Sequence, residues 1–306
     1  MNTSLALDVL AIAAHRDDVE QTCGGTLLKM AERGQRTGIL DLTQGEMGTR
    51  GTAEDRAREA EEAARILRVS WRHALDIPDG RVENNWENRL KVARVIRQTR
   101  PRVVILPYWK GRHPDHYTAS KLGYEACFLG GLAKLDLERA LSNQHSAFSQ
   151  VASAVASVVA GEEQDYVGRA PSPAESVGTD FGRGTTSSRA VQGSKEVPAL
   201  AAEGLAPHRP FKIIYATLYY DIRPTFVVDI TDQFEARFES LMAYKSQFSD
   251  QEAGKDIFPA RAEIRARIES MARFYGMLAG VTYAEPFLQK EVGLVEDVTA
   301  IPVKSI

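Results

Sequence analysis

The sequence predicts an α/β fold in which helices cover a mostly parallel sheet. Short apolar runs rich in β-branched residues recur along the N-terminal half, and an amphipathic helical segment follows each of them. This alternation is typical of βαβ units around a parallel sheet. Crossovers between parallel strands are right-handed, which leaves few topologies. We expect the common strand order 3-2-1-4-5.

Local patterns predict each element in turn. Apolar runs between turn residues predict strands at 7–14, 37–42, 72–77, 103–107, 211–218 and 225–230. Helical spacing of apolar residues predicts helices at 22–33, 53–67, 87–99, 118–129, 231–245 and 259–278. Gly34 closes the first helix and Pro101 stops the third, as expected for helix ends.

The 306 residues are interpreted as a single domain with an insertion at about 146–208. The chain is 43% apolar and can bury a full core. The stretch 146–208 differs, because it is rich in Ala, Ser, Gly, Pro and Glu and has few large apolar residues. Such a composition cannot bury enough surface to order itself, so we expect a flexible excursion.

Composition also excludes several classes of function. A net charge of −3 and a pI of about 6.1 give no overall field that would attract nucleic acid or an anionic membrane. Two cysteines make no disulfide framework, which suits a reducing compartment. The apolar run 5–14 is too short for a signal peptide or a membrane span. We therefore expect a soluble cytoplasmic protein.

Two short polar segments carry the chemistry. Residues 14–18 (Ala-His-Arg-Asp-Asp) follow the first predicted strand, and residues 111–116 (Gly-Arg-His-Pro-Asp-His) follow the fourth. Open α/β sheets bind ligands beyond the carboxyl ends of their strands, at the point where the strand order reverses. In the expected order, strands one and four are neighbours at that point. The two segments should therefore meet in one crevice.

The residue types in these segments indicate a catalytic divalent metal. His15, Asp18 and His116 can supply two imidazoles and one carboxylate, and three protein ligands with open positions are typical of catalytic zinc. A bound metal lowers the pKa of water towards roughly 7 and polarises a carbonyl group. Asp17 lies beside a ligand and suits a general base. Metal-dependent hydrolysis is the leading interpretation.

Two further residues of the second segment have expected roles. A protonated His113 could stabilise an oxyanion or protonate a leaving amine. Asp115 could hold the other ring nitrogen of His113, as carboxylates around metal sites often do.

Each segment alone has an ordinary explanation. An Asp-Asp pair after a strand is often a solvated turn or a helix cap, and a His-Pro-Asp-His run could be a surface loop. The two together, each after a strand, favour a site.

Other chemistries find less support. The first strand–helix turn lacks Gly-x-Gly-x-x-Gly, which disfavours a nucleotide-binding oxidoreductase. No Gly-x-Ser-x-Gly elbow supports a serine hydrolase. Cys23 could be a nucleophile, but a buried small residue is the simpler interpretation. A non-catalytic metal-binding or sugar-binding protein stays open, although Asp17 argues against it because binding needs no base.

These segments together resemble the LmbE/PIG-L family of zinc-dependent N-deacetylases. The resemblance is closest to the bacillithiol branch, the N-acetylglucosaminyl-L-malate deacetylases. It is carried by AAHRDDVEQTCGGTL, LTQGEMGTRGTAEDR, PYWKGRHPDHYTAS, AYKSQF and GVTYAEPF, which are spread over most of the chain outside 146–208. The resemblance implies a Rossmann-like three-layer fold with C-terminal strands and helices. The sequence departs from the family pattern at Arg16, where Pro or Ala is usual, and in the insertion.

The resemblance implies the same roles at matching positions. His15, Asp18 and His116 would bind Zn²⁺, or another divalent ion such as Fe²⁺. Asp17 would be the base, and His113 would stabilise the tetrahedral intermediate.

The resemblance also implies residues that contact the substrate. Arg50 and Arg112 would face the substrate, and Glu46 would lie near the sugar. Tyr219 or Tyr220 would reach over the acyl group, and the family pattern does not choose between them.

The implied reaction is hydrolysis of the N-acetyl group of an N-acetylglucosaminide. For the bacillithiol branch the implied substrate is N-acetylglucosaminyl-L-malate, and its hydrolysis gives glucosaminyl-malate and acetate in bacillithiol biosynthesis. Arg50 would then pair with a malate carboxylate, since Arg binds carboxylates through two parallel hydrogen bonds. Alternatives are another sugar, such as a thiol conjugate or a chito-oligosaccharide. The expected partners are a small-molecule substrate and further copies of the chain, with no nucleic acid or membrane.

Overall fold

A computed structural model describes residues 5–142, 205–218, 221–249 and 259–303. The chain forms two compact units, residues 1–137 with 205–306 and residues 138–204. Nearly all of the second unit lies outside the described residues, so a flexible insertion at 146–208 stays a prediction. Residues 205–208, expected in that insertion, belong to the first unit, where the His208 imidazole lies 2.8 Å from the carbonyl oxygen of Pro101.

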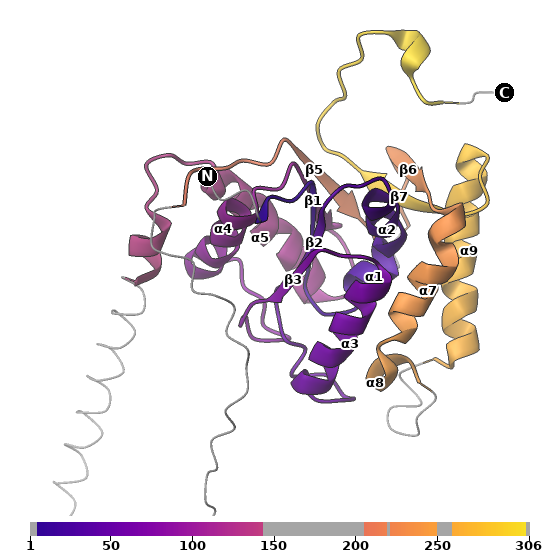
Figure 1. Cartoon of the computed structure of the whole chain (residues 1–306), viewed down its shortest axis with the longest axis horizontal. Helices are drawn as coiled ribbons and strands as arrows, with labels where there is room; N and C mark the ends of the chain where they lie inside the picture. Colours follow the sequence, from indigo (N-terminus) through magenta and orange to yellow (C-terminus); the bar gives the residue numbers. More distant parts are fainter. Residues whose placement is uncertain (1–4, 143–204, 219–220, 250–258, 304–306) are drawn as a thin grey trace, which may run out of the picture. The chain divides into compact units, whose positions relative to one another are not determined.

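The first unit is built on one seven-stranded sheet with the order β3-β2-β1-β4-β5-β7-β6 (Figure 1). The first five strands in chain order are parallel to one another, and their order confirms the expected 3-2-1-4-5. β7 is antiparallel to both β5 and β6. The strands are β1 (Val9–Ala13), β2 (Thr37–Asp41), β3 (Trp71–Ala74), β4 (Val103–Pro107), β5 (Lys212–Ala216), β6 (Phe226–Asp229) and β7 (Ala284–Leu288).

β7 was not expected from the sequence, because it contains Glu285 and Pro286, which are both rare in strands. The proline is tolerated because β5 pairs only with the last two residues of β7, which leaves Pro286 with β6 alone as a neighbour. The Glu285 carboxylate is fully buried and accepts the backbone N–H groups of Gly25 and Thr26. This charged strand residue therefore caps the helix that begins at Gly24.

Helices cover both faces of the sheet. They are α1 (Asp18–Thr22), α2 (Gly24–Glu32), α3 (Ala53–Ile66), α4 (Trp86–Thr99), α5 (Pro114–Gly130), α7 (Phe234–Met242), α8 (Lys245–Phe248) and α9 (Arg261–Ala279), with short 3₁₀ turns η2 (Thr231–Gln233) and η3 (Val298–Ala300). α4 packs on α5, whereas α1, α2 and α3 all contact α7 (Figure 1). No helix in the described ranges combines the length and the apolar content needed to cross a bilayer.

Three helix boundaries differ from the expectation, each for a local reason. The helix expected at 22–33 starts at Asp18 and is interrupted at Cys23, whose backbone is not helical. The helix expected at 118–129 starts at Pro114, because His113 caps it. The helix expected at 231–245 is a 3₁₀ turn followed by α7 and α8.

A glycine in α9 allows the close approach of the segment that leads into β7. Gly276 is buried, and a Cβ atom there would lie 2.7 Å from the carbonyl oxygens of both Val281 and Thr282. Because these atoms belong to the backbone, they cannot move aside as a flexible side chain would.

We expect Gly276→Ala to lower the free energy of unfolding by about 1–3 kcal/mol, the usual cost of overpacking a tight contact. Urea denaturation followed by circular dichroism measures the change. Ala279→Ser, at an exposed position of the same helix, is the matched control and should shift stability by less than about 0.5 kcal/mol. Equal midpoints for both variants would contradict the close approach.

Candidate functional site

The first group of polar side chains lies on a strained turn after β1. Asp17 adopts the left-handed conformation with φ 103°, which is unusual for a residue other than glycine. The turn is closed by the Asp18 carboxylate, which accepts the backbone N–H of His15 at 2.9 Å. His15 and Asp18 are therefore held on the same side of the turn, and backbone strain of this kind often marks functional sites.

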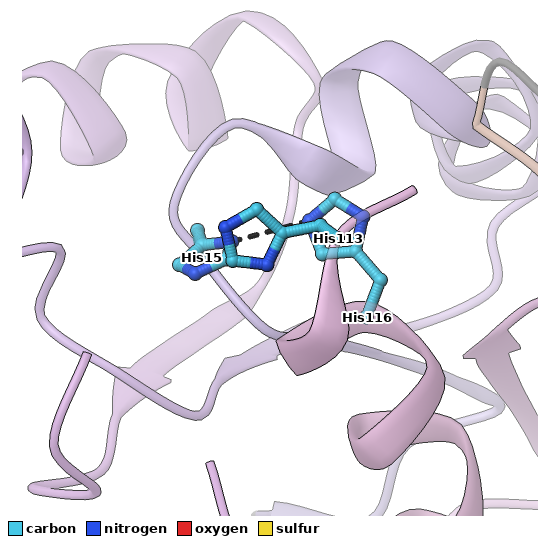
Figure 2. Close-up of side chains that lie close together, drawn as sticks. All are labelled: His15, His113 and His116. Carbon is cyan, nitrogen blue, oxygen red and sulfur yellow. Dashed lines mark hydrogen bonds between the residues drawn. The ribbon is translucent and has the colours of Figure 1, made fainter. Parts of the chain in front are cut away.

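The second group lies on the first turn of α5, directly beyond β4. His113 is the N-cap, and its Nδ1 accepts the backbone N–H of Asp115 at 3.2 Å. Pro114 occupies the first helical turn, where its missing N–H costs nothing. This cap places His113, Asp115 and His116 within one turn. Figure 2 shows the imidazoles of His15, His113 and His116 gathered where the turn after β1 meets the start of α5.

Three of the predicted residues converge on one point. Nδ1 of His15 lies 3.2 Å from Nε2 of His116 (Figure 2, dashed line). The Asp18 carboxylate completes the group, with Oδ1 at 3.2 Å from His116 Nε2 and Oδ2 at 3.6 Å from His15 Nδ1. The structure thus brings together the segments after strands β1 and β4, as the strand order predicted.

The other edge of the His15 ring faces two buried carboxylates. Nε2 of His15 lies 3.0 Å from Asp79 Oδ1 and 3.3 Å from Asp115 Oδ2. The Asp115 oxygens also accept the backbone N–H groups of Gly80 and Val82, at 2.8 and 3.2 Å. The carboxylate positions are therefore fixed by the loop after β3.

Two sets of side chains in the described part of the chain place one donor atom per residue within 4.8 Å of one another. They are His15 with His113 and His116, and His15 with Asp79 and Asp115, so the predicted set of His15, Asp18 and His116 is not one of the two. Sequence reasoning missed Asp79. Its signal was a Pro-Asp-Gly turn soon after a parallel strand, at the same edge of the sheet as the other two segments.

The expected partner of Asp115 was wrong. Its carboxylate contacts the imidazole of His15, and the ring of His113 accepts the backbone N–H of Asp115. The reason is that the backbone N–H groups of Gly80 and Val82 also bind this carboxylate and hold it beside His15.

Burial and neighbouring charges shift the pKa values of these groups. Burial lowers the pKa of His15, but hydrogen bonds with Asp115, Asp18 and Asp79 outweigh it and raise the pKa to about 12. Burial alone would raise the pKa of Asp18, yet the charges of His116 and His15 hold it well below its ordinary value. The pKa of His113 is lowered by burial and by the neighbouring imidazoles. This favours neutral His113, rather than the protonated form that was expected.

Asp17 occupies a different environment from Asp18. Burial raises the pKa of Asp17 to about 7, and the Arg56 guanidinium, 3.6 Å away, opposes this rise. Arg56 also donates to the carbonyl oxygen of Arg16 at 2.6 Å, and this hydrogen bond to the backbone stabilises the strained turn.

Arg16, the departure from the family pattern, does not add its charge to the donor cluster. Its guanidinium Nη1 donates to the carbonyl oxygens of Ala53 and Gln44, at 2.8 and 3.3 Å. The side chain therefore ties the turn after β1 to the loop after β2 and the start of α3.

The residues expected to contact substrate differ in their exposure and in their hydrogen-bond partners. Glu46 is exposed and accepts the backbone N–H of Asp79 at 2.8 Å, so it lies near the cluster. Arg50 is buried, and its Nη1 donates to the carbonyl oxygens of Gln247 and Ser249, at 3.2 and 3.3 Å. Arg112 is exposed and makes no hydrogen bond or ion pair with another described residue. Tyr219 and Tyr220 lie outside the described residues.

Cys23 is fully buried, and burial raises the pKa of its thiol. This confirms the interpretation as a small core residue rather than a nucleophile.

Known proteins resemble this chain in sequence and in structure. The PIG-L family model, described as GlcNAc-PI de-N-acetylase, matches residues 10–127. A diacetylchitobiose deacetylase of Thermococcus kodakarensis is 26% identical over 288 residues, which are 90% of this chain and 80% of that protein. The uncharacterized deacetylase YaiS of Escherichia coli is 30% identical over 125 residues, which are 39% of this chain and 67% of YaiS.

The fold has solved counterparts. The crystal structure of the conserved protein TT1542 from Thermus thermophilus is 32% identical and covers 95% of this chain and 98% of its own, with a TM-score of 0.65. This agreement covers nearly the whole length of both chains. With the matched family segment that carries His15, Asp18 and His116, it leads to one conclusion: the chain belongs to the PIG-L family of deacetylases.

Proposed function

We propose that this protein is a metal-dependent N-deacetylase of N-acetylglucosaminides, with an uncharged chito-oligosaccharide as its preferred substrate class. The observation that carries the proposal is the convergence of His15, Asp18 and His116 on one point. The Thermococcus relative, named for diacetylchitobiose, supports the substrate class.

The three side chains suit a single divalent ion. His116 Nε2 lies 3.2 Å from both His15 Nδ1 and Asp18 Oδ1, which is close to the edge, roughly 3.3 Å, of a tetrahedron with bonds of about 2.05 Å. The other Asp18 oxygen, Oδ2, lies 3.6 Å from His15 Nδ1. Two imidazole nitrogens that face each other at 3.2 Å need a proton or a cation between them. Two nitrogens and one carboxylate oxygen suit Zn²⁺, and Fe²⁺ accepts the same donors.

The two other candidate donor sets fit less well. His113 already uses Nδ1 to accept the backbone N–H of Asp115. Asp79 and Asp115 accept backbone N–H groups, so they suit the role of orienting His15. A hydrogen bond from His15 Nε2 to these carboxylates would leave Nδ1 available as a ligand once a cation takes the place of its proton.

A divalent cation at this point would polarise the amide carbonyl and favour ionisation of the attacking water. Asp17, with a pKa of about 7, is suited to take the proton from that water at neutral pH. The water oxygen bonds to the acyl carbon, the C–N bond breaks, and the nitrogen leaves with a proton as a free amine. The other product is acetate.

His113 has a separate task in this reaction. Because its Nδ1 accepts an N–H, the ring proton resides on Nε2 of the neutral imidazole. That N–H can donate to the oxygen on which negative charge develops, and such donors contribute strongly to acyl transfer.

The malate glycoside remains a prediction of the resemblance. It needs a cation for the two carboxylates, since burying them unpaired is costly. Arg50 was expected to supply it, but its Nη1 donates to two backbone carbonyl groups. Arg112, which is exposed, is the remaining arginine that could pair with a malate carboxylate. A neutral sugar needs no such pairing with either arginine.

The substrate class is tested by incubating the purified protein with N-acetylglucosamine, N,N'-diacetylchitobiose and N-acetylglucosaminyl-L-malate. Released amine is measured with and without a chelator. We expect chelator-sensitive hydrolysis with kcat/KM highest for the disaccharide. A higher value for the malate glycoside would favour the bacillithiol branch. No amine from any of the three would contradict the deacetylase proposal.

The metal ligands are tested by a matched pair of histidine variants. We expect His116→Ala to lose bound metal and activity together, because the remaining two donors cannot hold the ion. His113→Ala should retain the metal and lose activity. Elemental analysis of the purified variants measures occupancy. Full occupancy in His116→Ala would remove it from the ligand set, and metal loss in His113→Ala would favour the set of three imidazoles.

The base is tested by Asp17→Asn, which keeps the shape of the side chain and removes its proton acceptor. We expect unchanged metal content and a fall in kcat of about 10²–10⁴-fold, the usual contribution of a general base. Asp76→Asn, at an exposed carboxylate paired with Lys91, is the control and should keep full activity. A nearly active Asp17→Asn would assign the base to another group.

A further inference from the structure

Lys290 follows β7, and its ammonium group lies against three aromatic rings. Its Nζ is 4.7 Å from the ring centroid of Trp109, 4.9 Å from that of Tyr124 and 4.6 Å from that of Tyr215. A cation within about 6 Å of a ring centroid is attracted by the negative face of the ring. We call Trp109, Tyr124 and Tyr215 the aromatic cage.

The aromatic cage joins elements that are far apart in the sequence. Trp109 follows β4, Tyr124 lies on α5, and Tyr215 belongs to β5. Tyr215 is fully buried, and its ring meets that of Trp109 edge-on, with centroids 4.8 Å apart and an interplanar angle of 89°. The ring of Tyr215 is therefore a fixed support against which Trp109 and Lys290 are held.

Trp109 begins the loop that leads from β4 to the donor cluster. Tyr108, Lys110 and Gly111, which flank Trp109, line the small space beside that cluster. A substrate bound at the cluster would therefore meet this loop, and the position of the loop bears on how well the substrate binds.

The loop has few contacts of its own. Lys110 and Arg112 are exposed, and none of residues 110–112 forms a hydrogen bond or an ion pair with another residue of the described ranges. The position of the loop therefore depends on its two ends. One end is fixed by His113, which caps α5. The other end is Trp109 in the aromatic cage.

We propose that Lys290 is a positioning residue for substrate binding, because its charge holds Trp109 against Tyr215 and so keeps the loop beside the donor cluster. The inference rests on the proposed function, since it concerns the glucosaminide that the site would cleave. Without the charge, the loop occupies its binding position for a smaller fraction of the time, and the apparent affinity falls by that fraction. The turn that carries Asp17 is held by other contacts and keeps its geometry.

The position of the loop is tested by limited proteolysis of the full chain. Trypsin cleavage after Lys110 and Arg112 reports the open population of the loop, and mass spectrometry of the new termini measures both cuts. We expect Lys290→Met, which keeps an apolar side chain without the charge, to raise the cleavage rate about fivefold. This corresponds to ~1 kcal/mol, the scale of a cation–π contact at an exposed site. Lys290→Arg should stay within about twofold of the unmodified chain, because arginine also binds ring faces.

Arg209→Met is the matched control. It removes a guanidinium whose carbon lies 4.7 Å from the ring centroid of Phe128, towards the other end of α5. Cleavage after Lys110 and Arg112 should not change in this variant. Equal cleavage in Lys290→Met and in the control would overturn the proposal, and so would a rise in Lys290→Arg as large as that in Lys290→Met.

The effect on binding is tested with the metal-loaded enzyme and whichever of the three glycosides it hydrolyses fastest. We expect Lys290→Met to raise KM about two- to fivefold with little change in kcat, and Lys290→Arg to keep the original KM. An unchanged KM in Lys290→Met, or a fall in kcat alone, would contradict a role in substrate binding. No amine from any glycoside with the unmodified enzyme would instead refute the proposed function, while the proteolysis still shows whether Lys290 fixes the loop.

Tyr124→Leu removes one ring of the aromatic cage and leaves Lys290 in place. Because Tyr124 is 42% exposed, the substitution disturbs the core little. Cleavage after Lys110 and Arg112 should rise in the same direction as in Lys290→Met. If Lys290→Met does not fold, this variant decides the question, and unchanged cleavage would overturn the proposal.

Discussion

The imidazole of His15 links three segments that are far apart in the chain. Its Nδ1 faces Asp18 and His116, while its Nε2 faces Asp79 and Asp115. One ring therefore connects the turn after β1, the loop after β3 and the start of α5. Because both ring nitrogens are engaged, its orientation is fixed from two sides. The geometry of the donor cluster depends on this ring more than on any other side chain.

A second network holds the turn that carries His15. Arg72 on β3 pairs with Asp41 at the end of β2, with Nε–Oδ2 and Nη2–Oδ1 distances of 2.8 and 3.0 Å, and with Glu20 of α1 at 2.7 Å. Tyr244 donates to the same Glu20 oxygen. Buried ion pairs of this kind add little net stability, because desolvation offsets their attraction. Their effect is positional, since they fix α1 against β2 and β3.

Much of the fold was predictable because periodicity and topology follow simple rules. The five parallel strands and their order were expected from alternating apolar runs and right-handed crossovers. β7 was missed because Glu285 and Pro286 contradict strand propensity, and only the partial pairing with β5 and the buried helix cap explain them. Local sequence carries no information about such compensation.

The meeting of the segments that contain His15, Asp18 and His116 at one edge of the sheet was predictable from the sequence, because strand order brings the ends of β1 and β4 together. The use of the neighbouring groups became visible only in the folded chain. Asp79 comes from the loop after β3, Asp115 turns towards His15, and Arg16 donates to the backbone carbonyl group of Ala53 at the start of α3. The physical reason is that side-chain direction depends on turn strain, helix caps and burial, which are settled only when distant segments pack together.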